Sequence, residues 1–148
     1  MTLLVLAIAG VAIAGYLTAA HYTPLPLVCS TTGVIDCAQV TTSAYSVVPG
    51  TTVPITVPGL AWFFVSGVLA IDALRRRPPA TRLCLTHLLW ATTGLLVALY
   101  LVFVEIVRLH RICLWCSAVH LFLLAGFLVA FGRWQALPEA TAAPVEER

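Results

Sequence analysis

The sequence predicts an all-α membrane protein: a bundle of four transmembrane helices with an extracytoplasmic loop that contains a short helix. Of the 148 residues, 61% are hydrophobic and 9% are charged, whereas a soluble domain carries about 25% charged residues. Four apolar segments each approach the roughly 20 residues that cross a bilayer. They cover residues 3–20, 58–73, 83–107 and 112–131. The formal net charge of +2 is too small to indicate a nucleic-acid partner.

The first apolar segment, residues 3–20, has the position of a signal peptide. It lacks a basic n-region, however, and its apolar stretch is long for such a peptide. We therefore expect it to remain as an uncleaved span. Residues 1–133 are expected to form one transmembrane domain. Residues 134–148 are polar, and we expect them to form a disordered cytoplasmic tail.

Arginine placement predicts the orientation of the helices. The stretch "RRRPPATR" at residues 75–82 lies between the second and third spans, whereas the long first loop has Asp36 as its only charge. Because short loops rich in arginine stay in the cytoplasm, we expect a multi-pass protein of the inner (plasma) membrane with both termini cytoplasmic. Arg108 and Arg111, in the short outward connection, oppose this prediction without reversing it. The first loop, with a short helix near residues 37–44, then faces outward.

The five cysteines are divided unequally between the two sides of the membrane. Cys29 and Cys37 lie in the outward loop, and Cys113 and Cys116 begin the fourth span at the same side. Cys84 lies at the cytoplasmic end of the third span, and we assign it no role. Four cysteines therefore gather on the side that is oxidising in a bacterium or in the endoplasmic reticulum. The arginine pattern does not depend on the cysteines, so the two patterns agree independently.

The stretch "RICLWCSAVHL" contains a Cys-x-x-Cys pair at a helix start. The spacing of Cys113 and Cys116 puts both sulfurs on one helical face, close enough to bridge. A helix N-terminus favours a thiolate, which is the attacking species in thiol–disulfide exchange. Ser117 and His120 lie on the same face, where they could hydrogen-bond a ligand beside the sulfurs.

Two other interpretations of the cysteines stay open at this point. In the first, both pairs are static disulfides that staple the loop of a non-catalytic membrane subunit. In the second, the four cysteines bind zinc, with His21 or His110 as a further ligand. Zinc sites commonly use two tight cysteine pairs, and the Cys29-x7-Cys37 spacing is loose.

The sequence resembles the vitamin K epoxide reductase family of the bacterial type. The resemblance rests on "CSTTGVIDCAQVTTSAY" at residues 29–45, on "CLWC" and on the four-span plan, and it covers residues 3–131. It implies a four-helix bundle around a quinone. By this resemblance Cys116 engages the quinone and Cys113 exchanges with the loop pair. The family also places a serine, here Ser43, near the redox centre.

The resemblance implies a quinone-dependent thiol–disulfide oxidoreductase that supports disulfide bond formation. Electrons would pass from a separate thioredoxin-like or DsbA-like extracytoplasmic protein to Cys29 and Cys37. They would then pass through the "CLWC" pair to a quinone of the menaquinone, ubiquinone or vitamin K type. Vertebrate members have a tyrosine at the position of His120 and use an asparagine near the quinone, and this chain has no asparagine. We therefore expect reduction of a plain quinone rather than of an epoxide.

The expected quinone pocket is apolar with few polar groups. The side chains that we expect to contact the quinone are Ser43, Trp62, Trp115, Ser117 and His120. Glu105 lies near the outer end of the third span, where an intramembrane carboxylate is a candidate functional group. We favour instead a pair with Arg108 at the headgroup level. The other four-helix bacterial disulfide-generating family keeps its Cys-x-x-Cys in the first outward loop, and the reverse order here argues against it.

Overall fold

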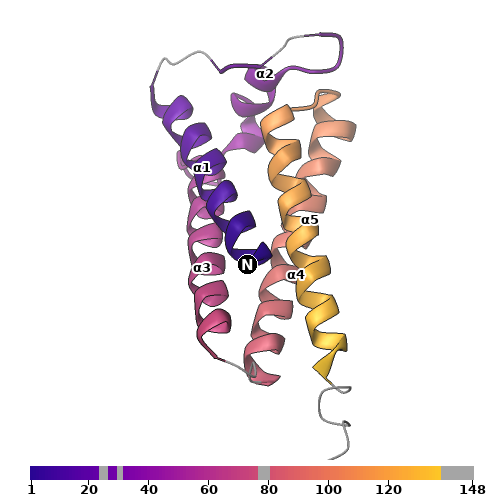
Figure 1. Cartoon of the computed structure of the whole chain (residues 1–148). Helices are drawn as coiled ribbons and strands as arrows, with labels where there is room; N and C mark the ends of the chain where they lie inside the picture. The colour runs from indigo at the N-terminus through magenta and orange to yellow at the C-terminus, as the bar shows by residue number, and fades with distance from the viewer. Residues whose placement is uncertain (24–26, 30–31, 77–80, 138–148) are drawn as a thin grey trace, which may run out of the picture.

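The computed structural model describes residues 1–23, 27–29, 32–76 and 81–137. Four long helices run up and down through the molecule, and two short helical segments cross one end of it (Figure 1). No named strand occurs within the described residues, which confirms the all-α prediction. In chain order the elements are α1 (Thr2–Tyr22), α2 (Cys37–Thr41), η1 (Ala44–Ser46), α3 (Thr56–Arg75), α4 (Thr81–Phe103), η2 (Val104–Leu109) and α5 (Leu114–Gln135).

Each of the four long helices is long and apolar enough to cross a bilayer. These are α1, α3, α4 continued through η2, and α5. Helices α1, α3 and α4 with η2 extend beyond their predicted spans by one or two residues at each end. Helix α5 begins two residues later than predicted and ends four residues later. Large apolar side chains such as Phe64, Leu89 and Leu121 are more than half exposed, as expected for side chains that face lipid. The chain is therefore a multi-pass membrane protein.

Small residues let the helices approach closely. Helix α1 packs along α3, α4 packs along α5, and α1 also contacts α5. A Cβ atom at Gly10 of α1 would overlap the ring of Phe63, and one at Gly94 of α4 would overlap the ring of Trp62. Lipid chains are as apolar as the helices, so packing at such positions is a main source of association. Ala14, Phe63, Ala98 and Leu123 form the centre of the bundle.

The outer loop lies across one end of the bundle (Figure 1). Its helix α2 begins after Asp36, whose carboxylate accepts a hydrogen bond from the backbone N–H of Gln39 at 2.9 Å. This is an N-cap, and it explains why a helix begins at Cys37. The predicted short helix in this loop is thereby confirmed. At the opposite end of the bundle Arg76 pairs with Asp72 at 2.9 Å.

Helix α4 ends in a wider, π-helical turn, η2, followed by a tight reversal. His110 has a φ of 51°, in the left-handed region, and the N–H of Arg111 donates to the carbonyl of Glu105 at 3.0 Å. Helix α5 begins at Leu114, four residues after His110. It ends at Gln135, two residues beyond the expected domain boundary. Residues 138–148 lie outside the described residues, so the disorder expected for the tail stays a prediction.

Candidate redox site

A short main-chain pairing fixes the outer loop to the start of α5. The N–H of Ile112 donates to the carbonyl of Val34 at 2.9 Å, and the N–H of Asp36 donates to the carbonyl of Ile112 at 3.1 Å. Ile35 and Ile112 thereby form a parallel bridge. Cys113 follows this bridge by one residue and Cys37 follows it by two. The register of the bridge therefore brings the two cysteines together.

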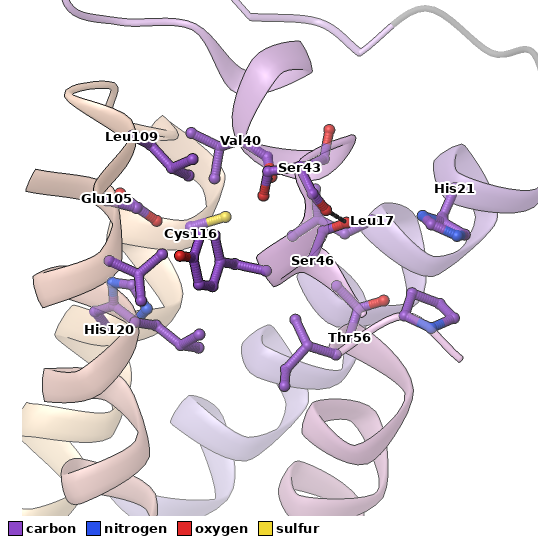
Figure 2. A pocket seen from close by; sticks show the side chains of 16 residues that line it. Leu17, His21, Val40, Ser43, Ser46, Thr56, Glu105, Leu109, Cys116 and His120 are labelled. Atoms are coloured by element: carbon purple, nitrogen blue, oxygen red, sulfur yellow. Dashed lines mark hydrogen bonds between the residues drawn. The ribbon is translucent and has the colours of Figure 1, made fainter. Parts of the chain in front are cut away.

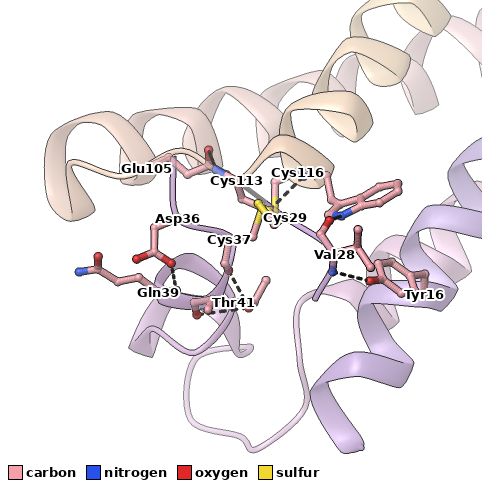
Figure 3. The surroundings of a disulfide bond; sticks show 12 residues. Tyr16, Val28, Cys29, Asp36, Cys37, Gln39, Thr41, Glu105, Cys113 and Cys116 are labelled. Carbon is pink, nitrogen blue, oxygen red and sulfur yellow. Dashed lines mark hydrogen bonds between the residues drawn. A yellow bond between two sulfur atoms is a disulfide. The ribbon is translucent and has the colours of Figure 1, made fainter. Parts of the chain in front are cut away.

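All four outward cysteines gather at this point. Cys29 and Cys37 form a disulfide with a Cα–Cα distance of 6.1 Å, and Cys113 and Cys116 are free thiols. Cys37 and Cys113 are completely buried and form one cluster with Val40, against which Cys29 and Cys116 pack. Figure 3 shows the sulfurs between α2 and the first turn of α5. The loop disulfide and the "CLWC" thiols are therefore packed together in one apolar cluster.

Cys113 is the N-cap residue of α5. Its sulfur accepts a hydrogen bond from the backbone N–H of Cys116 at 3.3 Å. The thiol of Cys116 is a hydrogen-bond partner both of this sulfur and of Glu105. Its interaction with Cys113 is the main reason that the pKa of Cys113 is below its ordinary value despite burial. The N–H groups of Cys116 and Trp115 lower the pKa of Cys113 further. The surroundings of Cys113 therefore favour its thiolate, which is the reactive form of a cysteine in disulfide exchange.

Glu105 points into the redox site rather than toward the headgroups. Its side chain is only 6% exposed, and its Oε2 accepts a hydrogen bond from the backbone N–H of Cys113 at 3.3 Å. The Cys116 thiol is a second hydrogen-bond partner of this carboxylate. The expected pair with Arg108 is wrong, because Arg108 instead donates to the hydroxyl of Tyr45 at 3.2 Å. Glu105 continues the inner face of α4, because it follows the buried Ala98 by seven residues, about two helical turns.

Two cavities meet at Cys116. The smaller one, of about 60 Å³, lies beneath α2, and Figure 2 shows the Cys116 sulfur, Glu105, Ser43 and His120 around it. The larger one, of about 390 Å³, lies among all four long helices. Cys116 and His120 line both cavities.

The larger cavity has the chemistry that a quinone requires. Its walls are almost entirely apolar and include the rings of Trp62 and Phe63. Its volume is in the range typical of small-molecule pockets, which are mostly apolar with a few polar groups. The thiol of Cys116 and the imidazole of His120 supply two of those polar groups. These residues fit a quinone ring bound against a reactive sulfur.

The structure brings some of the predicted quinone contacts together and separates others. Trp62 and His120 line the larger cavity with Cys116, and Ser43 lines the smaller one. The hydroxyl of Ser43 donates to the carbonyl of Val40 at 2.8 Å, so it also closes the end of α2. Ser117 lines neither of these two cavities.

Trp115 also lies outside both cavities and contacts the loop instead. Its Nε1–H donates to the carbonyl of Val28 at 3.0 Å. The N–H of the same Val28 donates to the hydroxyl of Tyr16 at 3.0 Å, and the Tyr16 and Trp115 rings lie 5.2 Å apart. These two side chains hold the residue that precedes Cys29, and Figure 3 shows the hydroxyl of Tyr16 beside Val28. The sequence alone had no signal for this contact, because it joins three distant segments.

Comparison with known proteins identifies the family of the chain. No curated protein sequence matches the chain. A family model does match it, over residues 1–131, and these residues include the four long helices almost completely, the outer loop and all five cysteines. The chain therefore belongs to the vitamin K epoxide reductase family, whose members are membrane thiol–disulfide oxidoreductases linked to quinones.

Proposed function

We propose that this chain oxidises a separate thioredoxin-like or DsbA-like extracytoplasmic protein and passes the electrons to a quinone from the bilayer. One observation carries the proposal: the loop disulfide and the "CLWC" thiols form a single buried cluster with Cys116 at the wall of an apolar cavity. A lipid-soluble quinone can approach Cys116 from within the bundle. A water-soluble protein cannot, so it requires the cysteine pair of the outer loop as a relay.

The order of the exchanges follows from the positions of the cysteines. Cys29 borders an outer groove beside α2, where a dithiol of the partner attacks it and reduces the loop disulfide. Cys37, packed with Cys113, then attacks the oxidised "CLWC" pair at that sulfur. The loop returns to the disulfide form, and Cys113 and Cys116 become thiols. The arrangement in the structure, with a loop disulfide and two free thiols, corresponds to this stage.

The final step returns Cys113 and Cys116 to a disulfide. Two thiols lose two electrons and two protons, and a quinone is the acceptor of the same number when it is bound. Trp62 and Phe63 provide flat apolar surface for the ring, and His120 provides a polar contact beside Cys116. The menaquinone, ubiquinone and vitamin K types all carry the quinone ring that these residues would contact.

The arrangement of charges supports the proposed location in the inner (plasma) membrane. Arg75, Arg76 and Arg82 flank the connection between α3 and α4, at the opposite end of the bundle from the cysteine cluster (Figure 1). Arginine-rich short loops remain cytoplasmic. Both termini would then be cytoplasmic, and both cysteine pairs would face the oxidising compartment.

The test is quinone reduction by purified protein with a dithiol reductant, followed by ultraviolet absorbance. We expect the parent and a Cys84→Ser control to turn over, since Cys84 lies in α4 away from the cluster. Cys116→Ser should reduce quinone no faster than the reductant alone. If the parent is inactive while Cys113 and Cys116 remain a disulfide in the presence of reductant, the pair is a structural staple and the proposal fails.

A further inference from the structure

Glu105 is a buried carboxylate, and the thiol–disulfide exchanges proposed above do not require it. It belongs to η2, at the end of α4, and is 6% exposed. It contacts both cysteines of the "CLWC" pair, through the N–H of Cys113 and the thiol of Cys116. It has no salt-bridge partner among the described residues, where the ion pair is that of Asp72 with Arg76. A carboxylate in this position is costly to bury.

A structural role alone does not require an acid at this position. The amide of a glutamine has nearly the same shape and could accept the hydrogen bond from Cys113 without the cost of burying a charge. What the carboxylate adds is the capacity to take up and release a proton. It has this capacity beside the sulfur that lines both cavities.

The proposed reaction requires local proton transfer. Oxidation of two thiols releases two protons, and the quinone oxygens take up two. Cys113 is fully buried and Cys116 is half-buried, so bulk water does not solvate both sulfurs directly. The cavity that Glu105 lines shares Leu101, Cys116 and His120 with the larger cavity. Glu105 therefore lies beside the source of the protons, in a cavity that adjoins the space that would hold their acceptor.

We propose that Glu105 takes the proton from the Cys116 thiol and transfers it toward the bound quinone, an inference that rests on the proposed function. The S–H bond of Cys116 breaks as an O–H bond forms on Glu105. That O–H bond then breaks as the quinone oxygen gains the proton. The proton of the Cys113 thiol leaves in the same way. The S–S bond forms as the two sulfurs together lose two electrons, which pass to the quinone. Glu105 ends each cycle as it began.

Other titratable groups border the same space. His120 projects from α5, His21 from α1 and Tyr45 from η1, and all three line the smaller cavity with Glu105. His120 is the one of these three that also borders the larger cavity. It is placed to extend the transfer from Glu105, whereas His21 and Tyr45 lie on the side of the outer loop.

The experiment compares Glu105→Gln with the parent and with Asp72→Asn, which removes a carboxylate from the opposite end of the bundle. The protein is reduced at Cys113 and Cys116 and mixed once with quinone. We expect Glu105→Gln to slow this single turnover roughly 100-fold, as for loss of a general acid–base group. Asp72→Asn should retain the parental rate. Glu105→Asp, which restores an acid, should recover part of the loss.

A second measurement separates proton transfer from a structural effect. The charge of Glu105 disfavours the Cys113 thiolate, so Glu105→Gln should shift the ultraviolet absorbance of that thiolate to lower pH. Slower quinone reduction together with easier thiolate formation is the expected result, and mass spectrometry of the Cys29–Cys37 disulfide confirms the fold. A parental turnover rate in Glu105→Gln overturns this inference alone. An inactive parent overturns the proposed function, and the inference with it.

Discussion

Cys113 and Cys116 are three residues apart but lie in different surroundings. Cys113 is completely buried against the loop pair, where hydrogen-bond donors converge on its sulfur. Cys116 is half-buried and faces the two cavities. The pair therefore presents one sulfur to the loop and one to the two cavities. This division gives a physical basis for the separate roles proposed for the two residues.

The lowered pKa of Cys113 predicts the effect of removing its neighbour. A lowered pKa means that the thiolate persists to lower pH. Cys116→Ala removes the largest cause, the hydrogen bond from the Cys116 side chain, and keeps the backbone N–H. The thiolate absorbance of Cys113, titrated in a Cys84→Ser background, should therefore appear at higher pH than in the chain with Cys116. An unchanged midpoint would show that the helix N-terminus alone stabilises the thiolate.

Among the elements, the outer loop depends on contacts with α1 and α5. The bridge at Ile112 fixes its second half, and the contacts of Tyr16 and Trp115 with Val28 fix the segment that carries Cys29. The loop disulfide must remain against Cys113 for exchange and must also be reached by a partner. Each segment of the loop is held by only a few of the hydrogen bonds named here, so one segment can detach while the other stays in place. This suits a loop that must both contact Cys113 and be reached by a partner.

Tyr16→Phe tests this attachment. The substitution removes the hydroxyl that accepts from the N–H of Val28 and keeps the ring beside Trp115. A net hydrogen bond contributes on the order of 1 kcal/mol, so we expect a small dithiol to reduce Cys29–Cys37 about fivefold faster. Tyr100→Phe, at an exposed position of α4, serves as the control. Equal reduction rates in both variants would mean that the hydroxyl does not hold the loop.

The contact between α1 and α3 depends on Gly10. A Cβ at this position overlaps the ring of Phe63, whereas a Cβ at Gly15 of the same helix has nothing within 4 Å. Gly10→Ala should therefore lower stability in detergent by about 1–3 kcal/mol, the usual range for overpacking. Gly15→Ala should leave it unchanged or slightly higher, because alanine favours a helix. A thermal unfolding series on the two variants measures the difference, and equal losses would contradict the packing argument.

At the scale of the whole molecule, the bundle separates two chemically different ends. The cysteine cluster and outer loop occupy one end, and the arginines near the α3–α4 connection occupy the other (Figure 1). Cys84 lies near the start of α4, so the length of this helix separates it from the redox cluster. Orientation in the membrane therefore decides which compartment supplies the electrons.

Reporter insertions test the proposed orientation. Alkaline phosphatase, active only outside the cytoplasm, should be active when inserted at the exposed turn of Gly50 and Thr51. The same enzyme fused after Arg148 should be inactive, whereas a fluorescent protein there should fold and fluoresce. The reverse pattern would place the cysteines in the cytoplasm and would contradict the proposed route of electrons.

Much of the fold could be predicted because its main signals are local. A span is recognised from the length and apolar character of one segment, and the four spans are confirmed with small changes at their ends. The short loop helix is also confirmed, since Asp36 provides its N-cap beside Cys37. The family was recognised from the two cysteine motifs and is confirmed by the match over residues 1–131. The tail and the individual roles of the site residues stay predictions.

The sequence by itself determined the four spans, the placement of the cysteine motifs at one end and the family. Each of these depends on residues close together in the chain or on composition. The tertiary structure alone decided that Ile35 pairs with Ile112, that Trp115 holds the loop and that Glu105 faces the sulfurs. The first two join segments more than 70 residues apart, which leave no regular spacing. The third joins the end of α4 to the start of α5 across the reversal at His110, which brings the N–H of Cys113 to the carboxylate.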